Sequence, residues 1–440
     1  MKEFAGRHKT IFLLLFLFFI FLGWNLIVTD FYADEVWNFG FGYAITKGEV
    51  PYQDFNMVIP PLYSFILSFF FQLFGSNMLV FHIVNSFILT GFSYLLYILI
   101  SKKMFYLLLL LFIPYPATYP SYNILILFFF ALILALEKKK ENDYLIGFIL
   151  GLSLLTKQSI GFCLLLPSFF YFREPKKIFH RFIGLIIPCS FFVLYLLYHH
   201  TFQEFMNLCV FGLIDFSSNH SSYIVYYLLG IVYLVLSIYW IRSHPKEISF
   251  YYGLSMISMM IPLFEIYHTV LAFVCLFLVI LMKKEIPSFK PLFVFCSILI
   301  GVSCVHLMRL DGKITYPNSI PHFQYRMVSQ EAIQYIDTVN HYIDSLDREV
   351  VILSNNSYLF RIVRDEEITY LDLINYGNHG YHGTEKLIQL VKEKEGSIVM
   401  INQSDFNSFR QTNQKVLQYV VEHGTYLESV AGFDVYVLGG

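Results

Sequence analysis

The chain of 440 residues is 57% hydrophobic and only 14% charged, with a mean hydropathy of +0.59. A soluble domain carries roughly 25% charged residues, so this composition excludes an ordinary soluble protein and indicates a polytopic α-helical membrane protein. Charge is unevenly divided: residues 309–440 hold 11 Lys/Arg and 17 Asp/Glu, whereas residues 1–308 hold 19 Lys/Arg and 15 Asp/Glu. We therefore predict a transmembrane domain over residues 1–308 and an aqueous domain over residues 309–440. Because the tail is net acidic, it lacks the basic character of a nucleic-acid-binding surface.

Basic residues between the hydrophobic segments set the predicted topology, because short cytoplasmic loops carry an excess of Lys and Arg. The basic clusters all face one side if the chain crosses the membrane about eleven times. The N-terminus is then cytoplasmic, the tail lies outside the cell membrane, and Pro61 to Gly75 rests in the outer interface. The predicted crossings are residues 11–28, 78–100, 104–118, 120–136, 144–156, 159–172, 179–198, 223–241, 249–263, 269–282 and 292–308.

Several of these segments are shorter than the roughly 20 residues that a crossing helix needs. Three pairs of short segments are broken by polar residues, near Asn123, at Thr156 to Ser159 and at Glu265 to His268. We interpret each pair as a hairpin with its turn facing outward. The alternative is three long continuous spans, which would place Lys157 and Glu265 near mid-membrane. Irregular polar backbone at depth is tolerated where it lines a cavity, so the hairpins are expected to surround one cavity that opens outward.

The first outward segment, Tyr32 to Tyr63, is predicted to be a loop that carries Asp34, Glu35 and Asp54 beside lipid. Carboxylates kept at a membrane face cost free energy and commonly mark a functional site. Asp34 is placed to deprotonate or orient the hydroxyl group of a molecule that accepts a transferred group, called the acceptor below. Glu35 or Asp54 would assist Asp34 in this step. Tyr52 and Asp54 are expected on the side of the site where the acceptor binds. The alternatives are a solvated acidic pair that only sets topology, and an Asp54 that caps the stretch after it.

Lys157 is the predicted ligand of an anion such as a lipid phosphate, because it stands at the tip of an apolar hairpin. The alternative is a lysine that reaches the headgroups of membrane lipids. Glu265 and His268 lie on one face if they share a helical turn, where they could bind a sugar or phosphate, or merely pair with each other. The His and Cys residues lack the spacing of a zinc motif, so no metal site is predicted.

The tail has the pattern of a small α/β domain with a sheet that contains a parallel pair, because strand-like and helix-like segments alternate along it. The stretch from Asn378 to Gly383 could bind a glycan or close over the cavity, or it could be the turn before a helix. The predicted helices are Ser329–Leu346, Thr384–Lys394 and Gln414–His423, and the predicted strands are Val350–Leu353, Ser397–Ile401 and Phe433–Leu438.

Three motifs follow one another along residues 24–270. They are Asp34-Glu35 with the Lys47–Asp54 and Pro61–Tyr63 stretches, then Gly151–Gln158, then Pro262–His268. Together they resemble the GT-C superfamily of membrane glycosyltransferases, and within it the bacterial members related to protein O-mannosyltransferases and to the aminoarabinose transferases of lipid A. The tail matches no motif of that superfamily.

The resemblance implies a polyprenyl-phosphate-sugar donor, an acceptor at the outer face and inversion at the anomeric carbon. The position that matches the catalytic aspartate of the superfamily is Asp34. The lipid-linked donor is then a cosubstrate, no cofactor is needed, and membrane lipids surround the chain. The implied acceptor is a cell-envelope glycan, glycolipid or glycopolymer.

We therefore expect an inverting glycosyltransferase with a GT-C-like fold and an extracytoplasmic α/β domain. One alternative is a transporter or flippase for lipid-linked sugars, which is disfavoured because its ionisable residues should be spread over the membrane depth. A second is a non-catalytic member of the superfamily that acts as a scaffold. The predicted site residues are Asp34 and Glu35 for catalysis, Lys157, His268 and Glu265 for the donor, and Tyr52 and Asp54 for the acceptor.

Overall fold

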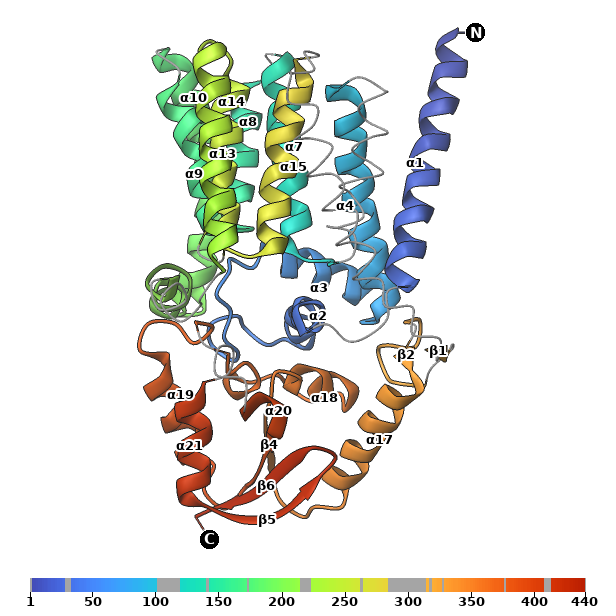
Figure 1. Cartoon of the computed structure of the whole chain (residues 1–440), viewed down its shortest axis with the longest axis vertical. Helices are drawn as coiled ribbons and strands as arrows, with labels where there is room; N and C mark the ends of the chain where they lie inside the picture. Colours follow the sequence, from blue (N-terminus) through green and yellow to red (C-terminus); the bar gives the residue numbers. More distant parts are fainter. Residues whose placement is uncertain are drawn as a thin grey trace. The chain divides into compact units, whose positions relative to one another are not determined.

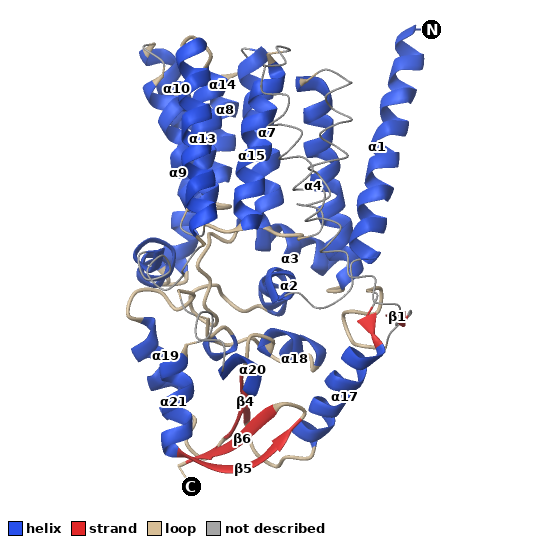
Figure 2. Ribbon diagram, viewed as in Figure 1, coloured by secondary structure: helices blue, strands red, loops and turns tan. Residues whose placement is uncertain are grey.

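The computed structural model of the chain is mostly α-helical, with a small sheet near its C-terminus (Figures 1 and 2). It divides into two compact units. Unit 1 comprises Met1–Thr29, Leu79–Val193 and Ser222–Leu310, and unit 2 comprises Asp30–Met78, Leu194–Ser221 and Asp311–Gly440. The predicted domain boundary at residues 308 and 309 lies outside the described residues. The structure describes residues 2–27, 33–100, 119–139, 142–171, 174–213, 223–261, 264–283, 314–315, 319–326, 328–375, 377–406 and 413–439.

Unit 1 is built from apolar helices that pack side by side (Figure 1). Helix α8 contacts α7 and α9, while α14 contacts α9 and α13, and α15 packs against α7, α13 and α14. Helix α10 continues from unit 1 into unit 2 at Leu194. The helices are α1 (Lys2–Ile27), α4 (Met78–Leu99), α7 (Tyr122–Lys139), α8 (Asp143–Leu154), α9 (Gln158–Phe170), α10 (Pro175–Tyr198), α13 (Ile224–Ser243), α14 (Ile248–Ser255) with the 3₁₀ turn η2 (Met256–Met260), and α15 (Ile266–Met282).

Four helices of the described residues, namely α1, α4, α10 and α13, are long and apolar enough to cross a membrane. Large apolar side chains are exposed on them, as at Phe191 of α10 with 72% and Ile224 of α13 with 77% of its surface accessible. Extended apolar surface of this kind marks a membrane or protein contact. The chain therefore carries four candidate membrane helices, which cover the predicted crossings 11–28, 78–100, 179–198 and 223–241.

The other predicted crossings are not matched by helices of this length. Ranges 104–118 and 292–308 lie outside the described residues, and the remaining five correspond to the shorter or more charged helices α7, α8, α9, α14–η2 and α15. At 1.5 Å per residue, a helix as short as α8 is only about 18 Å long. The hydrocarbon core is roughly 30 Å thick. The prediction of about eleven crossings is therefore met only in part.

Two of the three predicted hairpins have both arms described, and both are present. Helix α8 ends at Leu154 and α9 begins at Gln158. A Cβ atom at Gly161 would lie 2.3 Å from the Cα of Leu154, which shows that α9 turns back against α8. The segment η2 likewise ends at Met260, and α15 then packs against it. The alternative of continuous spans is wrong at both places. In the remaining pair, residues 104–118 and 120–136, the first segment lies outside the described residues.

Helices α8 and α10 approach each other closely through glycines. A Cβ atom at Gly147 would lie 2.0 Å from the backbone oxygen of Arg181, and one at Gly184 would lie 2.1 Å from that of Tyr144. Small residues at helix crossings allow the backbones themselves to touch, which is the usual way apolar helices associate in a membrane. Any side chain at either position must push the two helices apart.

A buried ionic cluster lies beside this crossing. Arg181, only 1% exposed, donates to both carboxylate oxygens of Glu137 at 2.7 and 3.1 Å and to Asp143 at 2.8 Å. The hydroxyl of Tyr252 also donates to Glu137, at 2.9 Å. The cluster joins α7, α8, α10 and α14, and it satisfies charges that would otherwise be costly to bury. The sequence analysis did not predict it.

Unit 2 combines two early helices with the tail. The predicted loop from Tyr32 to Tyr63 is wrong for most of its length, because α2 (Ala33–Lys47) is a helix and α3 begins at Leu62. The two helices pack tightly, since a Cβ atom at Gly42 would lie 2.8 Å from the Cβ of Leu67. The apolar stretch Pro61 to Gly75 forms α3, and its place at the outer interface stays a prediction. The elements before the sheet are α2, α3 (Leu62–Phe74), α11 (Phe202–Phe205), the π-helix η1 (Met206–Phe211), β1 (Ile314–Thr315), β2 (Val328–Ser329) and α17 (Gln330–Asp344).

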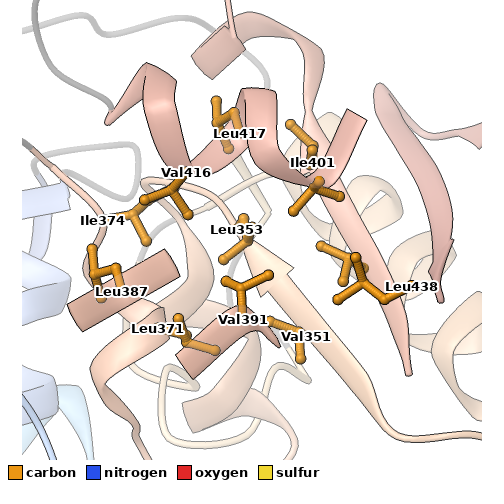
Figure 3. Close-up of a cluster of buried hydrophobic side chains, with 12 residues drawn as sticks. Val351, Leu353, Leu371, Ile374, Leu387, Val391, Ile401, Val416, Leu417 and Leu438 are labelled. Atoms are coloured by element: carbon orange, nitrogen blue, oxygen red, sulfur yellow. The ribbon is translucent and has the colours of Figure 1, made fainter. Parts of the chain in front are cut away.

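The tail sheet has the strand order β3-β4-β6-β5, with β3 and β4 parallel and the other pairs antiparallel. This confirms the predicted parallel component, and the predicted helices and strands of the tail are all present within one or two residues. Apolar side chains from β3, β4, α19 and α21 meet in one core (Figure 3). The elements are β3 (Val350–Leu353), α18 (Ser357–Val363), η3 (Tyr370–Asp372), α19 (Gly383–Lys392), β4 (Ile398–Asn402), α20 (Gln403–Phe406), α21 (Gln414–His423), β5 (Gly424–Val430) and β6 (Phe433–Leu438).

The close helix crossing gives a stability prediction. Gly147→Ala should lower the free energy of unfolding by about 1–3 kcal/mol, because the added methyl group meets backbone that cannot rotate away. Thermal unfolding of the purified protein in detergent measures the change. Gly23→Ala in α1 is the matched control, since nothing lies within 4 Å of its Cβ position. Equal melting temperatures for the two variants would contradict the crossing.

Candidate functional site

Asp34 lies in the first turn of α2 and is exposed. Acidic residues are favourable there because the helix dipole places partial positive charge at the N-terminus. The side chain of Asn38 donates to the backbone oxygen of Asp34 at 2.6 Å, which strengthens this turn. The carboxylate of Asp34 is thus carried by a helix rather than by a loop, and a helix holds a catalytic group more rigidly.

Glu35, the next residue, is buried instead, with 3% of its surface exposed. One of its carboxylate oxygens accepts a hydrogen bond from the Arg326 guanidinium at 2.7 Å, and the other lies 2.6 Å from the same guanidinium in an ion pair. Arg326 is itself only 1% exposed. Burial raises the pKa of Glu35, and the charge of Arg326 acts against that rise. Because Glu35 is enclosed and paired with Arg326, it anchors α2 to the tail. The catalytic roles expected of Asp34 and Glu35 stay predictions.

Further tail contacts hold α2 along its length. The ring of Tyr358 packs on Gly40, where a Cβ atom would lie 2.3 Å from its Cδ1. Near the end of the helix, the Asp365 carboxylate accepts from the Tyr43 hydroxyl and pairs with Lys47, both at 2.8 Å. These hydrogen bonds keep the pKa of Asp365 below its usual value. The tail therefore positions the helix that carries Asp34.

The turn after α2 contains the two predicted acceptor-side residues. Tyr52 is 1% exposed, has the unusual positive φ of 71°, and donates its hydroxyl to the Ile59 oxygen at 2.8 Å. Its own backbone oxygen accepts from the Tyr370 hydroxyl at 2.6 Å. Tyr52 therefore packs within the turn, and its place on the acceptor side stays a prediction. Asp54 is half-buried and accepts from the backbone N–H of Val50 at 2.6 Å, so it caps the residues before it rather than after it.

In unit 1, Lys157 precedes the first residue of α9 and is 7% exposed. Its ammonium donates to the side-chain oxygen of Asn123 at 3.0 Å and lies 5.4 Å from the ring centre of Tyr122. Glu265 interacts with it electrostatically. A lysine in this position has few water contacts, so an anion would be a strong alternative partner.

Glu265 precedes α15, and His268 lies in the first turn of that helix. The Nδ1 of His268 is 2.8 Å from a carboxylate oxygen of Glu265, which confirms that the two residues share one face. The Tyr267 hydroxyl lies 3.2 Å from that of Ser121 and donates to the Tyr119 backbone oxygen at 3.4 Å. The start of α15 is thereby tied to the segment that carries Asn123.

The three predicted donor-binding residues, Lys157, Glu265 and His268, therefore meet within unit 1, although they come from two different hairpins. Asn123, in the first turn of α7, joins them through its hydrogen bond with Lys157 and was not among the predicted site residues. The sequence feature that could have pointed to Asn123 is its position in a polar break, at the place where a hydrophobic run begins. Asp34 belongs to unit 2.

The tail segment from Asn378 to Gly383 is the turn before α19, in agreement with the simpler of the two interpretations. His379 is 7% exposed, and burial lowers its pKa to about 3, so it is uncharged. The backbone oxygen of Asn378 accepts from Asn56, and the N–H of Tyr381 donates to Asn207 at 3.1 Å. The segment joins parts of unit 2 and carries no ligand-facing cluster that we can assign.

Comparison with known proteins adds no assignment, because no protein-family model matches the chain and no curated protein matches it. The site must therefore be argued from its own chemistry. Among the described residues, no group of three or more His, Cys, Asp or Glu is arranged to hold a metal ion. The expectation that the reaction needs no metal stays a prediction.

The ion pair of α2 gives a second prediction. Arg326→Met should destabilise the protein by roughly 3–5 kcal/mol, since it leaves a buried carboxylate without its cation. The Glu35→Gln/Arg326→Met double variant should recover part of this loss. Chemical unfolding of the purified protein measures both.

The loss in Arg326→Met should also depend on pH. The pKa of buried Glu35 is higher in the folded than in the unfolded chain, so folding favours its protonated form. The variant should therefore be more stable near pH 5 than near pH 8, with stability falling as pH rises. A deficit that does not change with pH would mean that Glu35 carries no buried charge.

Proposed function

We propose that this chain is an inverting glycosyltransferase that moves a sugar from a polyprenyl-phosphate donor to an acceptor hydroxyl at the outer face of the cell membrane. The proposal includes a GT-C-like transmembrane domain with a cytoplasmic N-terminus and an extracytoplasmic tail. The observation that carries it is the meeting of Lys157, Glu265, His268 and Asn123 in unit 1. These residues stand at the ends of short apolar helices, where a lipid-linked phosphate would arrive.

Lys157 is suited to the phosphate of the donor. A cation held near a developing negative charge stabilises the leaving group most strongly where water is scarce. The Asn123 amide that accepts the hydrogen bond from Lys157 is neutral, and the carboxylate that attracts the ammonium is that of Glu265. The backbone N–H groups at the start of α9 add a favourable site for an anion. Glu265 and His268 are polar partners for the hydroxyls of the transferred sugar.

Asp34 is suited to activate the acceptor. Its carboxylate takes the proton of the acceptor hydroxyl while the hydroxyl oxygen forms a bond to the anomeric carbon. The bond from that carbon to the phosphate oxygen breaks on the opposite side, so the configuration inverts. The electron pair leaves with the phosphate of the polyprenyl carrier. Glu35 serves this step by fixing α2 through Arg326.

Asp34→Asn should lower the turnover number by about 10²–10⁴-fold, because an amide cannot accept the proton. Transfer of labelled sugar to envelope polymers in membrane vesicles measures it, after mass spectrometry of a deletion strain has identified the missing sugar. Asp337→Asn, on the exposed side of α17, is the matched control and should be fully active. Full transfer by Asp34→Asn would remove Asp34 as the base. Passage of lipid-linked sugar across the membrane without any transfer would favour a flippase.

Lys157→Ala should raise KM for the donor by about tenfold or more, since a charge-assisted hydrogen bond contributes roughly 1.5–3 kcal/mol. Kinetics at varied donor concentration measure the change. Lys177→Ala is the matched control, because that lysine is partly exposed and pairs with its neighbour Glu174 on the surface. An unchanged KM in Lys157→Ala would favour a lysine that binds membrane headgroups.

A further inference from the structure

Unit 2 contains a cleft of about 590 Å³ that the proposed reaction does not use. One wall is the turn that follows α2, from Lys47 to Asp54, and the other walls come from the tail around β3, η3 and α19. The cleft is therefore built by the same contacts that hold α2. Its size suits a small ligand or one section of a longer one.

The cleft is lined mainly by charged groups of both signs, four basic and five acidic. Each of the four basic side chains already has a carboxylate partner. Lys47 pairs with Asp365 at 2.8 Å, Arg361 with Asp372 at 3.0 Å, Lys386 with Glu204 at 2.8 Å and Lys394 with Glu349 at 2.5 Å. A phosphate or another anion would have to break one of these pairs, and an apolar lipid tail would bury charges without satisfying them.

The acidic lining can take more hydrogen bonds. Both carboxylate oxygens of Glu49 lie near the N–H of Ile368, at 3.2 and 3.3 Å. Burial raises the pKa of Glu49 to about 7, and the nearby charges of Glu367 and Asp54 add to the rise. Carboxylates only accept hydrogen bonds, whereas ammonium and guanidinium groups only donate them. A hydroxyl group does both, so a ligand rich in hydroxyls matches a lining of mixed sign.

The cleft lies at the far end of α2 from Asp34. Asp34 is in the first turn of this helix and Lys47, which lines the cleft, is its last residue. Thirteen steps at 1.5 Å place the two about 20 Å apart along the helix axis. A molecule that occupies the cleft and also presents a hydroxyl to Asp34 must therefore be a chain that spans this distance.

We propose that this cleft binds the acceptor at a distance from the reacting hydroxyl, and that the acceptor is an extended, hydroxyl-rich glycan. The inference rests on the proposed function for the role of Asp34, but binding in the cleft does not depend on catalysis. A single sugar or a lipid headgroup cannot occupy both ends of α2. Acceptor length is thus recognised by unit 2 alone.

Equilibrium binding to the purified full chain in lipid nanodiscs tests the inference. The probes are oligosaccharides released from envelope polymers, sorted into a short fraction and a fraction long enough to span about 20 Å. The wild-type protein should bind the long fraction about tenfold more tightly. Glu49→Gln should lose that preference, because an amide presents one acceptor where the carboxylate presents two.

Gln53→Trp provides a second variant. Gln53 is exposed and lines the cleft, so a larger ring there fills the space without removing an internal contact. It should also lose the preference for long glycans and should fold normally. Glu422→Gln, an exposed change on α21 away from the cleft, is the control and should keep the preference. The inference is overturned if the wild type shows no preference for length, or if the preference survives in both cleft variants.

Asp34→Asn separates this inference from the proposed function. It should lose sugar transfer but should still bind long glycans, since the cleft is intact. If long glycans bind in the cleft but no preparation transfers sugar, the glycan site stands and the proposed glycosyltransferase activity is wrong. If the wild type and Gln53→Trp both transfer sugar equally fast to the short and the long fraction, the glycosyltransferase activity stands and the glycan-binding role of the cleft is wrong.

Discussion

The buried pair between Glu35 and Arg326 is the interaction on which the candidate catalytic helix depends. The two charges lie in a place where water cannot reach them, so each is tolerated only because the other is present. Successive residues of a helix point about 100° apart, and an enclosed Glu35 therefore forces Asp34 toward the surface. An arginine of the tail thus decides where a carboxylate near the N-terminus points. This gives the tail a role that its own sequence did not reveal.

The polar groups of unit 1 are satisfied in a different manner. Lys157 and Glu265 precede α9 and α15, while Asn123 and His268 lie in the first turns of α7 and α15. Lys157 bonds to Asn123, Glu265 pairs with His268, and Glu265 also attracts Lys157. Such a network avoids an isolated charge in apolar surroundings. It also leaves the site exchangeable, because Asn123 is a neutral partner that a phosphate can replace with a gain in Coulomb energy. By contrast, the carboxylates of Glu137 and Asp143 neutralise the charge of Arg181, so this cluster has a structural role.

The tail could be predicted well from the sequence because its helices bury one regular stripe, as Ile333, Ile336, Val339 and Ile343 do on α17. Strand β5 was missed because its residues are almost all exposed and the strand is held by backbone pairing to β6. Helix α2 was missed because mixed polar and aromatic residues hide its apolar face, which α3 and the tail cover. The pairing of residue 35 with residue 326 has no local signal at all. The convergence of Lys157 with Glu265 was foreseen because polar breaks in apolar runs must find one another.

The membership of unit 2 has a consequence for recombination between related chains. The tail shares its unit with Asp30–Met78 and Leu194–Ser221, which are far away in sequence. A crossover that exchanged only the last third of the gene would separate Arg326 from its glutamate and Tyr358 from its glycine. Chimaeras should therefore inherit the three segments as one block. The properties of unit 2 would then pass between scaffolds in discrete steps, and the helices that lie wholly in unit 1 would be left unaltered.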